Sequence, residues 1–401
     1  MARPGQDLTT RRGTRIRVAR SVDELEPLRE AWEQLQGRQF STDPDVFPLI
    51  LGWQPQTLRP HVVALEREGE TTALVLGRIE DIRLRTRIGY RTVYAPRVRS
   101  LTVVYGGVLG DLDDEGAEVV LGALRHHLAC GEVDVLRLRN VDTGSPLRRA
   151  VGGTSNILHE HGAPTARHWE LAVPNSYDAF LGSLSPSTLK SARRYSRRLE
   201  KSFGDRLSFR IFRGASEGDR VFTDLAAVAR KTYQHALGVA FAQSEFERRI
   251  ERLLMNRGWF RAYVLYLDGE PISFWHGHAY RGAFFIGIPG YDPAYTDLRV
   301  GNYVLYRLIE DLCADDAIDT LDFGWGEAEY KRRLSTRSRL EQDVHLFAPT
   351  ARGCLTNVAR SSLLTGVTGV RSLLARTEMI DPIKRRWRDR LTSGGSSVVR
   401  Y

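Results

Sequence analysis

The order of expected helices and strands occurs twice along this chain, and this repetition constrains the fold more than any other feature. Each series has a strand, helix, hairpin, strand, helix and strand, and the second has one extra helix. The first comprises Arg15–Val18, Val22–Gln36, His61–Glu66, Thr72–Ile79, Leu101–Val108, Ala117–Cys130 and Val133–Leu138; the second comprises Leu207–Phe212, Asp219–Gln234, Ser244–Asn256, Phe260–Leu267, Pro271–Ala279, Ala283–Ile288, Gly301–Ala314 and Thr320–Phe323. We therefore expect a duplicated mixed α/β unit of about 150 residues.

The boundary between the copies is expected near Ala163–Arg167. The next residues, His168–Val173, have the pattern of a strand, and Pro174 then begins a polar turn into a connecting helical region. The sequence thus predicts an N-terminal domain over residues 14–165, a C-terminal domain over 166–350 and a basic helical tail over 351–401.

Composition places the chain among globular proteins, because 42% of its residues are hydrophobic and 9% aromatic. Residues 1–30 contain no apolar run of signal-peptide length, so a cytoplasmic location is expected. The three cysteines, Cys130, Cys313 and Cys354, are far apart, with no CxxC and no histidine cluster at metal-ligand spacing. We expect neither a disulfide framework nor a metal site.

The two copies differ in the loop that precedes the last helix. In the second copy, Ile288–Asp292 is followed by Arg299, Gly301 and Asn302 at a helix start, which suits an anion such as pyrophosphate. The corresponding stretch of the first copy, Gly110–Gly116, carries four carboxylates that would repel phosphate. The second copy is therefore expected to bind a phosphorylated donor, while an ordinary helix N-terminus with a surface arginine is the alternative.

A regular stripe of cations gives part of the net charge of +9. It recurs at helical spacing and comprises Lys190, Arg193, Arg194, Arg197, Arg198 and Lys201. The stripe, with Lys190 and Arg194 foremost, would hold phosphates of coenzyme A, a nucleotide sugar, a lipid-linked substrate or tRNA, or would be a solvated helix face. No nucleic-acid-binding fold is recognisable, so DNA is not an expected partner. A second cluster, Lys384–Arg390, suggests peripheral membrane contact or a solvated tail.

A strand at Leu321–Phe323 leads into the segment Gly324–Arg333, which reads GWGEAEYKRR. This segment resembles the FGxGxxxYKxxF-like signature of the GNAT-related acyltransferases found with cellulose and exopolysaccharide biosynthesis, often called CelD-like, which are akin to the Fem-type aminoacyltransferases. The resemblance covers about Phe180–Pro349. It implies tandem GNAT-like domains of mixed α/β structure, the first degenerate, and acyl transfer from a thioester or aminoacyl ester to an amine. Leu334 stands where an aromatic residue is expected.

The signature segment also supplies the candidate catalytic residues. Glu327, after two glycines, is the first candidate for general base or amine anchor, with a helix-dipole partner as its alternative, and Asp322 is a further candidate. Tyr330 would protonate the leaving group or orient the substrate, and Lys331 would hold a phosphate or carboxylate; a core tyrosine and a solvated lysine are the alternatives.

Three other residues complete the expected site. Strand alternation places His276 on one face with His278, so His276 is an alternative base, although histidines on a sheet are more often structural. Trp275 and Tyr291 are expected to contact the substrate. The sequence has no GxSxG motif and no evident paired Cys and His, which favours direct attack of the amine on the donor.

The preferred function is N-acylation of a small or carbohydrate-linked amine. Acyl-CoA is the expected co-substrate, and no permanently bound cofactor is expected. An aminoacyl-tRNA-dependent transferase is one alternative, because the basic stripe and the Fem-like kinship both permit it. The other is a non-catalytic scaffold of polysaccharide or membrane-surface machinery.

Overall fold

The computed structural model describes residues 8–9, 14–88, 91–161, 163–232, 241 and 244–376. Within this range the chain forms two compact units. The first runs to Arg167 and is taken up again from Arg339, and the second comprises His168–Ser338. The segment after Arg339, which the sequence assigned to the second domain and the tail, belongs to the first unit. The basic cluster Lys384–Arg390 lies outside the described residues.

The first unit is built on a mainly antiparallel sheet with the strand order β1-β2-β3-β4-β7-β8-β16. Its strands are β1 (Leu8–Thr9), β2 (Thr14–Ala19), β3 (Thr57–Arg67), β4 (Glu70–Arg83), β7 (Arg97–Gly110), β8 (Val135–Asp142) and β16 (Arg337–Phe347). Strands β7 and β8 are parallel. Helix α3 (Asp114–Ala129) connects them, because parallel neighbours need a crossover. A separate hairpin joins β5 (Thr86–Ile88) to β6 (Arg91–Tyr94).

The sheet of the second unit follows the same plan, with the strand order β9-β15-β13-β12-β11-β10. Its strands are β9 (Thr165–Ala172), β10 (Leu207–Phe212), β11 (Phe260–Leu267), β12 (Glu270–Tyr280), β13 (Ala283–Ile286), β14 (Gly290–Tyr291) and β15 (Thr320–Trp325). Strands β13 and β15 are parallel, and α10 (Val300–Cys313) connects them. Strand β14 pairs with β12 beyond the end of β13.

Corresponding hairpins confirm the duplicated architecture. The β3–β4 hairpin turns through Glu68 and Gly69, and the β11–β12 hairpin turns through Asp268 and Gly269, with positive φ at all four residues. Two successive positive φ values match the right-handed twist of the flanking strands in tight hairpins. The chain is therefore a tandem α/β protein, as the repeated element order predicted.

The first sheet is completed by a strand from a distant part of the sequence. Strand β16, which follows the second unit in the chain, pairs with β8 of the first sheet. Strand β9, at the start of the second unit, pairs with β15 of the second sheet. The first unit is thus discontinuous in sequence, whereas the second unit is the continuous stretch His168–Ser338 among the described residues.

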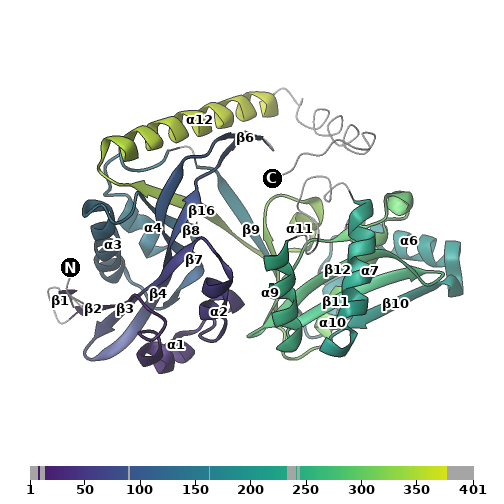
Figure 1. The fold of residues 1–401 in the computed structure, drawn as a ribbon. Helices are drawn as coiled ribbons and strands as arrows, with labels where there is room; N and C mark the ends of the chain where they lie inside the picture. Colours follow the sequence, from purple (N-terminus) through teal and green to yellow (C-terminus); the bar gives the residue numbers. More distant parts are fainter. Residues whose placement is uncertain are drawn as a thin grey trace. The chain divides into compact units, whose positions relative to one another are not determined.

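Helices cover these sheets (Figure 1). The first unit has η1 (Glu26–Leu28), α1 (Arg29–Leu35), η2 (Phe40–Thr42), α2 (Val46–Trp53), α4 (Pro146–Val151) and α12 (Ala351–Arg376); the second has α5 (Tyr177–Ser183), α6 (Pro186–Phe203), η3 (Gly204–Arg206), η4 (Ala215–Glu217), α7 (Gly218–Lys231), α9 (Glu245–Asn256), η5 (Pro293–Leu298) and α11 (Glu329–Leu334). No helix in the described part of the chain combines the length and the apolar character needed to span a membrane.

The second unit buries apolar side chains on both faces of its sheet. On one face, Tyr263 and Trp275 pack in a cluster with Leu308 of α10 and with residues of α5 and α6. On the other face, Phe260 contacts Phe222 of α7, and α9 lies against β11. Because side chains alternate along a strand, neighbouring residues of β12 face different helices. This alternation decides which candidate residues can meet.

Candidate functional site

The second unit contains a pocket of about 230 Å³ enclosed by α6, the start of α10 and α11. Most of its lining groups are polar. The lining residues are Thr188, Ser191, Ala192, Tyr195, Ser196, Arg299, Asn302, Tyr303, Leu305, Tyr306, Glu329, Tyr330, Arg333 and Leu334. Arg299, Asn302 and Tyr330, selected from the sequence, thus come together, whereas the α6 residues and Tyr303 carried no motif by which to recognise them.

The start of α10 has no side-chain cap. Arg299 occupies the N-cap position in the left-handed region, with φ of 54°, and none of its side-chain atoms caps the helix. Its guanidinium lies 5.9 Å from the ring centroid of Tyr195 on α6. Arg299, which lines the pocket, therefore places a cation at the positive end of α10, an arrangement that attracts anions.

The equivalent helix of the first unit is capped by its own carboxylate. Asp113 accepts a hydrogen bond from the backbone N–H of Gly116 and a bidentate pair from Arg67 at 2.9 and 2.7 Å. These interactions, the Arg67 hydrogen bond foremost, lower the pKa of Asp113. The acidic loop thus places a charge where a phosphate would otherwise bind, and the contrast between the two helix starts favours the second unit as the donor site.

Tyr330 sits on α11 against two aromatic rings. Its ring centroid lies 5.6 Å from that of Trp275 and 5.8 Å from that of Phe323, both edge to face. Burial raises the pKa of Tyr330 to about 12, so its hydroxyl stays protonated at neutral pH. Trp275 Nε1 donates to the carbonyl of Gly301 at 2.8 Å. Trp275 is therefore a buried link between the first turn of α10 and Tyr330.

Lys331 is committed to the turn that precedes α11. Only 7% of its surface is exposed, and Nζ donates to the carbonyls of Trp325 at 2.6 Å and Gly324 at 3.3 Å. Burial lowers the pKa of Lys331. The role expected from the sequence, binding of a phosphate or carboxylate, requires a free ammonium group, whereas this one holds the backbone. Glu327, in the same turn, is exposed.

Asp322 is paired with a residue that the sequence analysis did not select. His168 Nε2 lies 2.8 Å from Asp322 Oδ1, and Glu170 Oε1 lies 4.0 Å from the same nitrogen. The backbone N–H of Gly324 also donates to Asp322 Oδ1 at 2.7 Å. His168 and Asp322 are both buried. Their pairing anchors the turn to β9, so Asp322 is better placed to support the turn than to accept a proton from a substrate.

His276 lies on the sheet face opposite Trp275. Burial lowers the pKa of His276 to about 4 and that of His278 to about 3. Nδ1 of His276 is 3.9 Å from Glu251 on α9, and burial raises the pKa of that carboxyl group to about 8. A ring enclosed by phenylalanines and kept neutral is a poor base for a substrate in the pocket.

The remaining candidates lie at the rim of the pocket or outside it. Lys190 and Arg194 are exposed and do not line it, although Arg194 donates to the hydroxyl of Tyr195 at 2.9 Å. The rest of the basic stripe is exposed as well. Tyr291 is 36% exposed and lies beside Gly301, where an added Cβ would meet its ring at 3.7 Å.

A larger groove of about 680 Å³ lies in the first unit. Several of its charges are already neutralised by one another. Arg99 pairs with Asp81 at 2.9 Å, and the backbone N–H of Arg99 donates to Asp134 at 2.8 Å. This groove is remote in sequence from the signature segment, and the smaller pocket is the better candidate for catalysis.

The family comparison bears on this pocket directly. Residues 186–332 match the family model described as an acetyltransferase (GNAT) domain. The match begins at α6, includes α10 and ends within α11, so it spans all three walls of the pocket. This part of the second unit is thus similar to a GNAT acetyltransferase domain.

Several solved structures resemble most of the chain at low sequence identity. A conserved protein of unknown function from Bacteroides thetaiotaomicron is 10% identical, with a TM-score of 0.49 and coverage of 81% of this chain and 97% of that one. FemX is 9% identical, with a TM-score of 0.47 and coverage of 72% and 88%. A tandem GNAT protein from the clavulanic acid biosynthesis pathway is 12% identical, with a TM-score of 0.48 and coverage of 84% and 99%. None of the curated proteins matches the chain in sequence.

Proposed function

We propose that this protein transfers an acyl group from acyl-CoA to the amine of a small or carbohydrate-linked acceptor, and that the pocket of the second unit is the catalytic site. One observation carries the proposal: a single pocket joins the uncapped start of α10 to the protonated hydroxyl of Tyr330. A cytoplasmic location, where acyl-CoA is available, is part of the same proposal.

The two ends of the pocket suit the two ends of a thioester donor. Arg299 and the backbone N–H groups of the first turn of α10 would bind the pyrophosphate, since both favour negative charge. Asn302 would add a neutral hydrogen-bonding group. Tyr330 would then lie near the thioester, where a hydroxyl that remains protonated can donate to a departing thiolate.

The reaction needs no covalent enzyme intermediate. The amine nitrogen attacks the thioester carbonyl, the C–N bond forms, and the C–S bond breaks as the tetrahedral intermediate collapses. Tyr330 supplies a proton to the thiolate, and the amine loses its own proton to Glu327 or to water. Glu327 is preferred over His276 because it is exposed in the signature turn, whereas His276 is enclosed on the other sheet face.

Calorimetric titration with coenzyme A tests the proposal. The wild-type chain is expected to bind coenzyme A, and Arg299→Ala to weaken that binding about tenfold or more, since a hydrogen bond to a charged group contributes about 1.5–3 kcal/mol. Arg307→Ala is the matched control, because Arg307 lies on the same helix, pairs with Glu310 and does not line the pocket. Equal losses in both variants, or no binding to the wild type, would contradict the donor assignment.

An aminoacyl-tRNA donor is the second candidate, and the basic stripe on α6 favours it. Its six cations are exposed on one face of a helix whose other face lines the pocket. Binding of tRNA that falls steeply with salt, together with no affinity for coenzyme A, would support this donor. The family assignment favours either enzyme over the scaffold alternative.

A further inference from the structure

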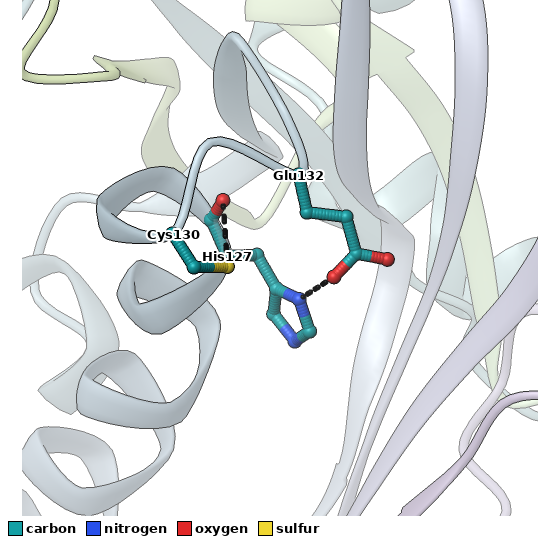
Figure 2. Close-up of side chains that lie close together, drawn as sticks. All are labelled: His127, Cys130 and Glu132. Carbon is teal, nitrogen blue, oxygen red and sulfur yellow. Dashed lines mark hydrogen bonds and ion pairs between the residues drawn. The ribbon is translucent and has the colours of Figure 1, made fainter. Parts of the chain in front are cut away.

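The end of α3 in the first unit brings together nitrogen, sulfur and oxygen donors. His127 lies in the last turn of the helix, Cys130 is its C-cap, and Glu132 follows in the turn toward β8 (Figure 2). One potential ligand atom of each residue lies within 4.8 Å of the other two. All three belong to a stretch of six residues that matches neither CxxC nor a histidine cluster, so the sequence pattern alone does not reveal the grouping.

These side chains already contact one another. His127 Nδ1 lies 2.6 Å from Glu132 Oε2, and the Cys130 thiol donates weakly to the carbonyl of His127 at 3.7 Å. In a tetrahedral zinc site, bonds of about 2.0–2.3 Å separate neighbouring ligand atoms by about 3.3–3.7 Å. His127 and Glu132 would move apart by about 1 Å as the ion replaces the proton between them. Cys130 is exposed and can rotate toward the ion.

A fourth residue provides an independent observation. His61 on β3 is fully buried, and neither of its ring nitrogens has a hydrogen-bond partner among the described residues. Its ring packs edge to face against that of His127, with the centroids 4.5 Å apart. An orphaned buried group of this kind calls for an explanation, and a bound ion is one of the few available. Imidazole is also among the commonest metal ligands.

The surroundings of the cluster suit a bound ion. Arg59 pairs with the other oxygen of Glu132, which leaves Oε2 directed at His127. Outer contacts of this kind orient metal ligands. The groove of about 680 Å³ in the first unit is lined in part by Gly131 and Glu132, which gives an ion a path from solvent.

We propose that His127, Cys130 and Glu132 bind a divalent metal ion of the zinc class, with His61 at the fourth position. Thiolate, imidazole and carboxylate together favour zinc over magnesium or calcium, which prefer oxygen ligands alone. The site lies in the first unit, away from the signature segment, so its role is structural: the ion joins the end of α3 to β3. The proposal does not depend on the catalytic function.

Metal content of the purified full-length chain tests the site. The reduced protein is loaded with zinc, dialysed, and assayed for retained metal, and a second sample is loaded with cobalt. We expect one equivalent of zinc in the wild type, a thiolate-to-cobalt charge-transfer band, and a higher melting temperature with metal than without it. Cys130→Ser is expected to abolish the band and to retain at least about tenfold less zinc.

His126→Asn is the matched control, because His126 is exposed, adjacent to His127 and outside the cluster. Equal metal loss in His126→Asn and Cys130→Ser, or no retained metal in the wild type, would overturn the proposal. His127→Gln should also retain less zinc than the wild type. If His127→Gln fails to fold, Cys130→Ser still tests the site, because Cys130 is exposed. If His61→Gln binds zinc as tightly as the wild type does, His61 is not a ligand of the ion.

Discussion

The hydroxyl of Tyr330 is the group of the pocket best placed to act as an acid, and Tyr330→Phe isolates it. The ring would keep its packing against Trp275 and Phe323, so only the hydroxyl is lost. With the pKa raised to about 12, that hydroxyl is protonated throughout the neutral range. We expect kcat to fall about 10²-fold while KM for acyl-CoA hardly changes, as measured by steady-state kinetics.

Tyr303→Phe is the control for this substitution, because Tyr303 lines the same pocket from α10 and its pKa is also raised by burial. It should leave kcat nearly unchanged. Equal effects from the two variants would mean that the pocket needs phenolic hydroxyls for shape or binding and not for proton transfer.

At this scale the sequence is most informative where function depends on neighbouring residues. Arg299 and Tyr330 could be selected because a helix start and a signature segment are local patterns. His168 could not, since its partner Asp322 is 154 residues away and the register of β9 against β15 sets their pairing. Strand alternation placed His276 with His278, but it could not tell that α9 covers this face.

The turn before α11 is the element that positions Tyr330. Gly324 and Gly326 have φ of 67° and 91°, a region that favours glycine. Asp322 holds this turn from one side through the N–H of Gly324, and Lys331 holds it from the other through two carbonyls. The element is thus a short helix fixed by side-chain contacts to its own entry turn.

Replacement of Lys331 by methionine tests that role. Lys331→Met keeps the buried chain but removes the donor, so it should lower the free energy of unfolding by about 1–3 kcal/mol. We expect kcat to fall with KM for acyl-CoA nearly constant, because Tyr330 shifts while the donor site at α10 remains. Arg332→Met, an exposed neighbour, is the control. A raised KM with kcat retained would instead indicate that Lys331 binds a donor phosphate.

Local sequence patterns predicted some elements better than others. The turn at Asp268 and Gly269 follows from residue type, and it occurs as expected. The helix expected over Val22–Gln36 is instead η1 (Glu26–Leu28) followed by α1 (Arg29–Leu35), since Pro27 near the start of η1 delays regular helix formation. Helix α2 (Val46–Trp53) gave no signal, because its apolar run has no clear period and contains Pro48.

At the scale of the whole molecule, the repeated element order predicted the tandem architecture but not how the first sheet is completed. Strand β16 follows the second copy in sequence and pairs with β8 of the first sheet. Sequence order alone cannot predict this pairing, because the strand would fit either sheet edge by residue type. The pairing makes the first unit depend on residues that lie far apart in the chain.

A buried network holds these distant segments together in the first unit. Glu160 follows α4, Arg360 lies on α12, and His345 lies on β16. Arg360 Nε donates to Glu160 Oε1, and Arg360 Nη1 donates to Thr86 at 2.7 Å. His345 Nδ1 lies 2.7 Å from Glu160 Oε2. At most 6% of each residue of the Glu160–Arg360–His345 set is exposed, so the network is shielded from solvent.

The pH dependence of unfolding tests this network. Burial alone would raise the pKa of Glu160, but His345 and Arg360 outweigh it and hold the pKa at about 2, below the ordinary 4.5. A depressed carboxyl pKa stabilises the fold above the ordinary value, and that stabilisation is lost as the pH falls toward 2. Glu160→Gln leaves Arg360 buried without its charge partner. It should lower the free energy of unfolding by about 3–5 kcal/mol at pH 7.

The difference in the free energy of unfolding between the wild type and Glu160→Gln should therefore become smaller as the pH falls from about 4.5 to 2. Over this range the wild type also loses the charge of Glu160, because its carboxylate becomes protonated. Denaturant unfolding followed by circular dichroism across this range measures it. Asp81→Asn, which breaks an exposed pair in the same unit, is the control and should change stability little at any pH. A difference in unfolding free energy that stays constant down to pH 2 would show that the charge of Glu160 does not stabilise the fold. Packing of β16 and α12 would then hold the separate segments of the first unit together.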